Sequence, residues 1–119
     1  MSTLAHQLGH AGEAAAATFL LTQGFVVLHR NYRYRRAEID LIVQREQQLL
    51  VFVEVKARSS TQFGYPETFV TERKRQLFRL AAEQVQEDLD WSGDIRFDVL
   101  AVMQTASGFQ IEHFEDAFY

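Results

Sequence analysis

Two stretches of alternating apolar residues lie close together in the chain, and they constrain its fold more than any other feature. The first covers residues 38–44 and the second residues 49–56, with the polar residues 46–48 at the turn. A period of two is the pattern of β-strands, and so short a connection indicates an antiparallel hairpin. We expect its wholly apolar odd-numbered face to be buried. That face consists of Ile39, Leu41, Val43, Leu49, Val51, Val53 and Val55.

The same hairpin brings charged side chains together on its even-numbered face. If the hairpin is centred on Gln47, Asp40 lies opposite Glu54 and Glu38 lies opposite Lys56. Opposed side chains have Cβ atoms about 4.5–5.5 Å apart, where like charges destabilise a sheet unless something neutralises them. A divalent cation would do so, and two carboxylates on rigid strands suit Mg²⁺ or Mn²⁺. Lys56 could then orient an attacking water or stabilise charge on a phosphate.

The alternative for these four residues is an ordinary solvated face with salt bridges between strands. The triplet Glu54-Val55-Lys56, however, ends the apolar run 49–53, so its charges lie where the strand passes from core to rim. This position favours a catalytic site. The prediction depends on the register, because a slip of one residue would move Asp40 to the other face.

The rest of the chain supplies two helices and three further strands. Helical spacing of apolar residues extends from Leu4 to Gln23, before Gly24, and resumes near Thr71. Strands are predicted over 25–33, 95–103 and 109–114. The order is helix, three strands, helix, strand and a short final strand, which indicates an α/β fold (α+β, mixed sheet) with helices packed on the sheet. The 119 residues show no linker or repeat, so one domain over 1–119 is expected.

Charge is unevenly distributed along the chain. Residues 1–80 hold eleven Lys/Arg against seven Asp/Glu, whereas residues 81–119 hold one against nine, and the net charge is −4. A local basic field can bind phosphates despite an acidic total. Tyr32 and Tyr34 lie among the arginines and could stack on exposed bases, which would suit branched or single-stranded substrates. The alternative is that these basic residues only solvate a corner of the sheet and a helix face, without binding nucleic acid. The predicted nucleic-acid-binding residues are Arg33, Arg35, Arg36, Arg58 and Lys74.

Several other classes of function are excluded by composition and motif. Without cysteine the chain has no disulfides, thiolate zinc site or cysteine nucleophile. It has no glycine-rich phosphate loop and no serine-hydrolase elbow. No apolar run approaches the ~20 residues of a membrane span, and no basic segment precedes an apolar stretch at the N-terminus. A cytoplasmic protein that does not enter a membrane is expected.

These motifs resemble the PD-(D/E)XK nuclease superfamily, and more specifically the YraN-like family of small bacterial proteins, which is similar to Holliday-junction resolvases. The matches include Gly12-Glu13, residues 38–42, residues 51–56, Phe63-Gly64 and residues 96–99. The resemblance implies a restriction-endonuclease-like core in which Asp40 and Glu54 are metal ligands, Lys56 is the catalytic lysine and Glu13 reaches the same site. Ala37 departs from the pattern, which usually has glycine there.

The function predicted is therefore that of a metal-dependent endonuclease, with Mg²⁺ or Mn²⁺ as cofactor. Its partner would be nucleic acid, with DNA favoured and RNA left open, in the form of branched or repair and recombination intermediates. Two-fold symmetric junctions would suit a homodimer. The alternative is a non-catalytic nucleic-acid-binding or DNA-repair module on a nuclease fold. Facing like charges favour the enzyme, since a binding module does not need them. Asp98 is expected to pair with a basic residue in a structural role, while His113 has no assigned chemistry.

Overall fold

The computed structural model describes residues 3–58 and 70–119, with side chains from residue 9 onward. Its two helices are α1 (Thr3–Thr22) and α2 (Glu72–Leu89). Its five strands are β1 (Val26–Tyr34), β2 (Ala37–Arg45), β3 (Leu49–Arg58), β4 (Asp94–Thr105) and β5 (Gly108–Phe114). The loop predicted after residue 58 and the family match at Phe63-Gly64 lie outside the described residues.

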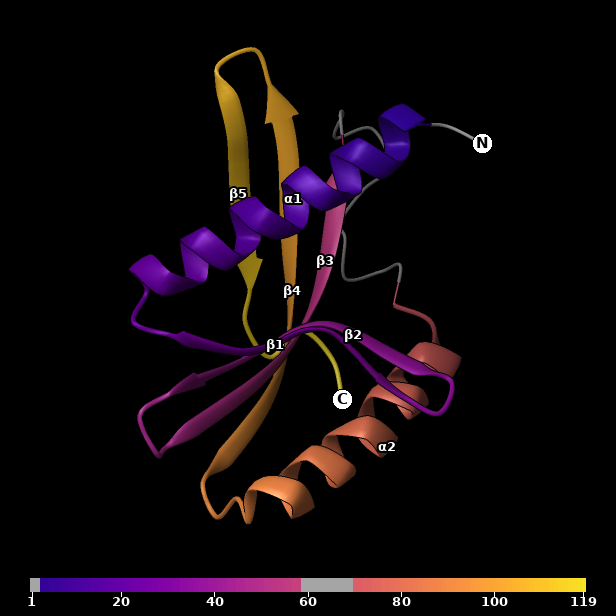
Figure 1. Cartoon of the computed structure of the whole chain (residues 1–119), viewed down its shortest axis with the longest axis vertical. Coiled ribbons are helices and arrows are strands. Elements are labelled where there is room, and N and C mark those ends of the chain that lie inside the picture. Colours follow the sequence, from indigo (N-terminus) through magenta and orange to yellow (C-terminus); the bar gives the residue numbers. More distant parts are fainter. Residues whose placement is uncertain (1–2, 59–69) are drawn as a thin grey trace.

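The five strands form one mixed sheet in the spatial order β1-β2-β3-β4-β5 (Figure 1). Strands β3 and β4 run parallel and are connected through α2, while the other neighbouring pairs are antiparallel. The predicted order of elements and the predicted mixed sheet are confirmed. None of the helices in the described part of the chain is long and apolar enough to cross a membrane.

Each helix covers one face of the sheet, so both faces are buried. Ala16, Ala17 and Leu20 of α1 pack in one cluster with Val51 and Val53 of β3. On the other face, Phe78, Ala81, Ala82 and Val85 of α2 pack in a second cluster with Leu50 and Phe52 of the same strand. The prediction of a single apolar face was therefore incomplete. Burial on both sides explains why residues 49–53 are continuously apolar.

The predicted register of the β2–β3 hairpin is confirmed where the strands pair. Leu41 pairs with Val53 and Arg45 with Leu49, as in a hairpin centred on Gln47. The pairing of these described strands ends at Leu41 and Val53, so Asp40 is not a backbone partner of Glu54. The two strands separate at the point where the predicted acidic residues begin.

Strand β2 also breaks its alternation at Asp40. Ile39 packs in the cluster under α2, whereas Leu41 packs in the cluster under α1. Residues two apart in a regular strand share a face, so Ile39 does not belong to the odd-numbered face on which it was predicted. Asn31 of the neighbouring strand has a left-handed φ of 53° in the same region. Such irregularities turn a side chain away from its regular direction.

Helix α1 crosses the sheet at unusually short range where Gly12 meets Ala57 of β3. A Cβ atom at Gly12 would lie 2.8 Å from the Ala57 Cβ, which is closer than packed carbon atoms approach. Glycine is therefore required for this crossing, and the next residue, Glu13, is brought close to the sheet.

Candidate active site

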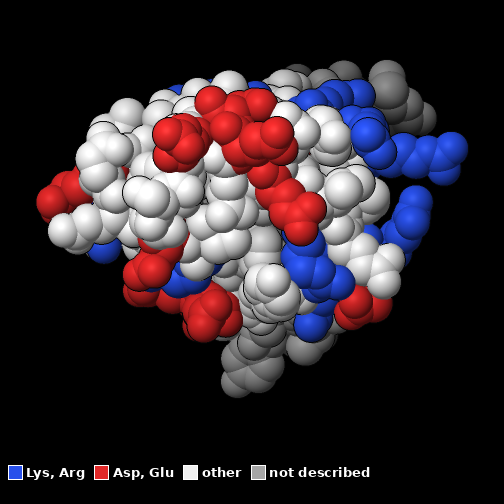
Figure 2. All heavy atoms as spheres, turned by 90° about the horizontal axis from the view of Figure 1, so that it is seen from below, with Lys and Arg blue, Asp and Glu red and all other residues white. Residues whose placement is uncertain are grey.

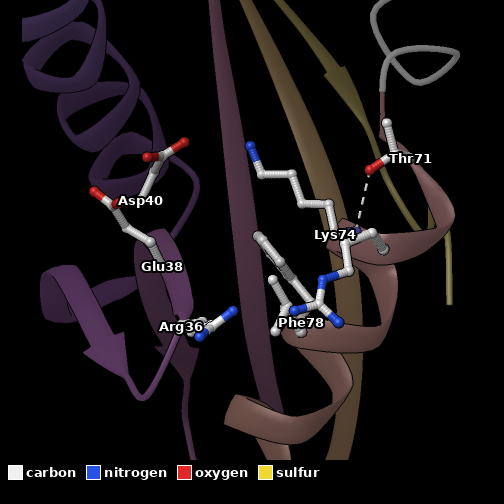
Figure 3. A pocket seen from close by; sticks show the side chains of 8 residues that line it. Arg36, Glu38, Asp40, Thr71, Lys74 and Phe78 are labelled. Carbon is white, nitrogen blue, oxygen red and sulfur yellow. Dashed lines mark hydrogen bonds between the residues drawn. The ribbon is translucent and has the colours of Figure 1, made fainter.

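A cleft of about 450 Å³ lies between the β1–β2 turn and the start of α2. One wall carries Arg36, Glu38 and Asp40, and the opposite wall carries residues of α2 and its N-cap (Figure 3). These are Thr71, Arg73, Lys74, Leu77 and Phe78. Both signs of charge thus face a partly apolar floor.

Asp40 is a partly buried carboxylate fixed by the backbone of β3. Its Oδ2 accepts a hydrogen bond of 2.7 Å from the Val55 N–H. Burial, followed by the negative charge of Glu54, raises the pKa of Asp40 to about 7, although the Val55 hydrogen bond acts in the opposite direction. Glu13 adds to the rise and Lys74 opposes it. Burial and the Glu54 charge thus disfavour the ionised form of Asp40, and a bound divalent cation would favour it.

Glu54 is a buried carboxylate held by two lysines. Its side chain is 5% exposed, and Oε1 lies 2.5 Å from Lys74 Nζ and 3.5 Å from Lys56 Nζ. Lys56 is thus on the same side of the sheet as Glu54, as predicted. The contact with Lys74 was not predicted, because nothing in the spacing of residues 54 and 74 indicates that α2 returns to this strand.

Glu13 lies near these carboxylates without completing a cluster with them. Burial, then the charges of Glu38 and Glu54, raises the pKa of Glu13, while His10 and Arg30 lower it. Among the residues that the structure describes, no three histidine, aspartate or glutamate side chains are close enough to hold a metal ion together. The predicted set of Glu13, Asp40 and Glu54 is therefore not assembled as a three-carboxylate site.

The donor chemistry of Asp40 and Glu54 nevertheless suits a hard divalent cation. Both offer carboxylate oxygens, the ligands that Mg²⁺ and Mn²⁺ prefer, and Mg²⁺ is commonly bound through one or two protein carboxylates with water and phosphate in the other positions. Burial is the larger cause of the raised pKa of Asp40, and such an ion would offset both this cost and the repulsion from Glu54. Two carboxylates, rather than three, therefore fit the group.

The predicted nucleic-acid-binding residues do not all lie in the cleft. Arg36 and Lys74 line it. Arg33 on β1 forms an exposed salt bridge of 3.6 Å with Glu38, and Arg35 lies at the hairpin turn, 5.3 Å from the centre of the Tyr34 ring. Arg58 ends β3, two residues beyond Lys56. The cations thus extend from the turn, across the cleft, to the end of β3.

The basic residues of α2 lie at the end of the helix where they interact unfavourably with the helix dipole. Its first turn holds Arg73, Lys74 and Arg75 beside Glu72, and its last turn has no basic residue. The N-terminus of a helix is its positive end, where a cation costs roughly 0.3–1 kcal/mol. On the face shown in Figure 2, many Lys and Arg side chains lie toward one side, although basic and acidic side chains also touch in places. The positive end of α2 faces the cleft, which favours an anionic ligand there.

Asp98 and His113 belong to a separate network on the face covered by α1. Asp98 accepts two hydrogen bonds from Arg96, at 2.8 and 2.9 Å, and one from the Asp116 N–H at 2.9 Å. Its Oδ2 is 2.6 Å from His113 Nε2, and that ring meets Phe19 of α1 edge-on. The predicted pairing of Asp98 with a basic residue is confirmed. The Arg96-x-Asp98 spacing indicates it, since residues two apart in a strand share a face.

Comparisons with known proteins agree on one family. The model of the uncharacterised protein family UPF0102 matches residues 12–102. A UPF0102 protein of Flavobacterium psychrophilum is 46% identical over 116 residues, covering 96% of this chain and 95% of that one. A UPF0102 protein of Prosthecochloris aestuarii is 40% identical over 126 residues, covering 100% and 98%. Among solved structures, the Ca²⁺ complex of Pyrococcus furiosus SfsA matches with a TM-score of 0.33 and 15% identity, covering 93% of this chain and 63% of that one. That likeness is too low to bear on function.

Proposed function

The chain belongs to the UPF0102 family of uncharacterised proteins, and we propose that it is a metal-dependent nuclease that hydrolyses phosphodiester bonds in DNA. The observation that carries this proposal is the pair of close, inward-held carboxylates, Asp40 and Glu54, with two lysines on the second. A structural ion pair would need only one of these carboxylates. Burial, and then the charge of Glu54, raises the pKa of Asp40, and perturbed carboxylates of this kind are common at functional sites.

Asp40 and Glu54 would hold the divalent cation, Mg²⁺ or Mn²⁺, and Glu13 would act on it through its charge. When bound, the cation would attract a phosphate and offset the charge that develops on it. Asp40 is suited to this role because its hydrogen bond to Val55 fixes one oxygen, Oδ2, and thereby orients the carboxylate. Glu54 is fixed equally well by its burial and its lysines.

Lys56 would act on the reacting phosphate or on the attacking water. Its ammonium lies 3.5 Å from Glu54, so it is on the side of the carboxylates and has hydrogen bonds left to donate. A fixed cation aimed at developing negative charge is worth about 10²–10³ in turnover. Lys56 is therefore the residue whose loss should separate catalysis from metal binding.

The DNA would approach along the basic residues on both sides of the cleft. Arg36 and Arg73 line its opposite walls, and exposed Arg35 extends the surface to the hairpin turn. We propose branched or partly unpaired DNA as the substrate, since Tyr34, whose ring centre is 5.3 Å from Arg35, and Tyr32 are only partly buried against the core and could stack on unpaired bases. A two-fold symmetric substrate of this kind would engage a homodimer.

The second candidate is a nuclease-derived module that binds DNA without cutting it. The salt bridge between Glu54 and Lys74 favours this candidate in part, because it already neutralises Glu54 without a cation. The pKa of Asp40 still argues for the nuclease, since burial and Glu54 disfavour the charge of that carboxylate more than Val55 and Lys74 favour it.

The test is a cleavage assay with Mg²⁺ and with Mn²⁺ on duplex, flap, junction and RNA substrates. Glu54→Gln should abolish cleavage and retain DNA binding, and Lys56→Ala should lower turnover by ~10² or more while metal still binds. Cleavage by Glu54→Gln at the parent's rate would mean that these carboxylates are ordinary charges. DNA binding without cleavage by the parent would favour the second candidate.

A further inference from the structure

Lys74 makes the shorter of the two lysine contacts with Glu54, and it does so from the side of the cleft. Its Nζ is 2.5 Å from Glu54 Oε1, whereas Lys56 Nζ is 3.5 Å from the same oxygen. The Lys74 side chain is 38% exposed and that of Lys56 21%. Figure 3 shows Lys74 extending from α2 toward the strand side of the cleft, where Asp40 lies. A ligand entering the cleft would therefore meet Lys74.

The backbone of Lys74 is fixed while its ammonium is at the end of a flexible stem. Thr71 caps α2 by accepting a hydrogen bond of 3.1 Å from the Lys74 N–H. Beyond this point four methylene groups separate the backbone from the charge, and lysine can redirect its donors by rotation. The cleft of about 450 Å³ gives the side chain room to move without displacing α2.

A divalent cation bound by Glu54 would compete with this ammonium. Two positive charges within a few ångströms of one carboxylate oxygen repel each other strongly in a partly buried site. The field of Lys74 also reaches Asp40. In the cation-free protein, one ammonium thus acts on both carboxylates that a metal ion would bind.

We propose that Lys74 is an exchangeable cation of the reaction centre, which neutralises Glu54 while no divalent cation is bound and turns to the substrate phosphate when one binds. This inference rests on the proposed nuclease function. It assigns Lys74 a contact with the substrate at the reacting phosphate, whereas Arg73 beside it attracts the DNA backbone in general.

Lys74→Met tests the competition directly, because methionine keeps the apolar stem and removes the charge. Mn²⁺ titration calorimetry without nucleic acid should give binding at least about threefold tighter than the parent's, since the repulsion is gone. Single-turnover cleavage should nevertheless fall about tenfold or more, because the phosphate loses a donor. Lys74→Arg keeps the charge and should keep the parent's Mn²⁺ affinity.

Arg73→Met is the matched control, because Arg73 lines the same cleft from the preceding residue. Its Mn²⁺ affinity should equal the parent's. Lys74→Gln provides a second neutral variant if circular dichroism shows that Lys74→Met is unfolded. Equal or weaker Mn²⁺ binding by a folded neutral variant would overturn the proposal for Lys74 even if the parent cuts DNA. If a neutral Lys74 variant binds Mn²⁺ more tightly but the parent cuts no DNA, the competition between Lys74 and the cation is supported and the nuclease function is rejected.

Discussion

The backbone N–H of Val55 donates a hydrogen bond to Asp40 Oδ2 at 2.7 Å, although strand pairing between β2 and β3 has already ended at Leu41 and Val53. A side chain thus replaces the backbone acceptor that a regular ladder would offer. This bond fixes Asp40 relative to Glu54 and Lys56, which lie on either side of Val55. The geometry of the candidate site therefore depends on a break in the sheet.

Asp40→Asn should stabilise the cation-free protein at neutral pH. The folded state raises the pKa of Asp40 from 3.8 to about 7, so the parent loses stability as pH rises between these values and carries the full penalty above pH 7. The variant lacks this penalty. Its advantage should be absent near pH 3.5 and reach the order of 1–3 kcal/mol at pH 8, as measured by urea unfolding across that range. An advantage that does not vary with pH would contradict the assignment.

Glu54→Gln should behave differently, because Glu54 has partners that Asp40 lacks. Its removal relieves the repulsion on Asp40 but leaves Lys74 and Lys56 without their carboxylate. No gain in stability is expected at pH 8. The pKa of Asp40, followed by NMR titration of its carboxyl carbon, should fall toward its ordinary value. An unchanged pKa would mean that burial alone accounts for the rise.

Replacing Arg35 and Arg36 together by alanine should weaken DNA binding. Each arginine removed from a phosphate contact lowers the salt dependence of binding, so the slope should fall by up to about two. Fluorescence anisotropy at several salt concentrations measures it. Arg45→Ala is the control, since Arg45 bonds to the Gln23 carbonyl oxygen and lies over the Phe25 ring at the other end of β2. A slope that is the same in the double variant and the parent would place the DNA elsewhere.

Gly12→Ala should destabilise the protein, because the new methyl group would lie 2.8 Å from the Ala57 Cβ. Overpacking of this kind costs roughly 1–3 kcal/mol. Gly9→Ala in the same helix meets no atom within 4 Å and should stabilise by up to about 1 kcal/mol, through helix propensity. Thermal unfolding of both variants gives the comparison. If both gain stability, α1 does not approach β3 as closely as described.

Asp98→Asn should lower stability without affecting the cleft. Burial acts to raise the pKa of Asp98, but hydrogen bonds from His113, Arg96 and the Asp116 backbone outweigh it and lower the pKa. This contribution to stability is present above the ordinary pKa of 3.8 and is lost as pH falls below it. The variant should lose about 3 kcal/mol at pH 7, in urea unfolding, and bind Mn²⁺ as the parent does. Loss of Mn²⁺ affinity in a folded variant would show that the network supports the site.

The pairing of β2 with β3 could be predicted because both alternate and the turn between them is short. The same register placed Asp40 directly opposite Glu54, which was wrong because the pairing ends at Leu41 and Val53. The burial of both sheet faces was harder to predict. Alternation of apolar and polar residues shows that the two faces differ, but it does not show that a helix covers the more polar face. Ile39 was placed on the wrong face because periodicity assumes a regular strand. The contact of Lys74 with Glu54 depends on how α2 returns to the sheet, which no local pattern records.

The reversed charge order of α2 has a consequence for affinity. Arg73, Lys74 and Arg75 crowd the end of the helix that is already positive, so the unbound protein holds an excess of positive charge there even though Glu54 neutralises Lys74. A polyanion that binds there would offset this excess positive charge. Part of the binding free energy would then come from the loss of repulsion among the cations of the first turn of α2. Inorganic polyanions with no resemblance to DNA should therefore also stiffen that turn.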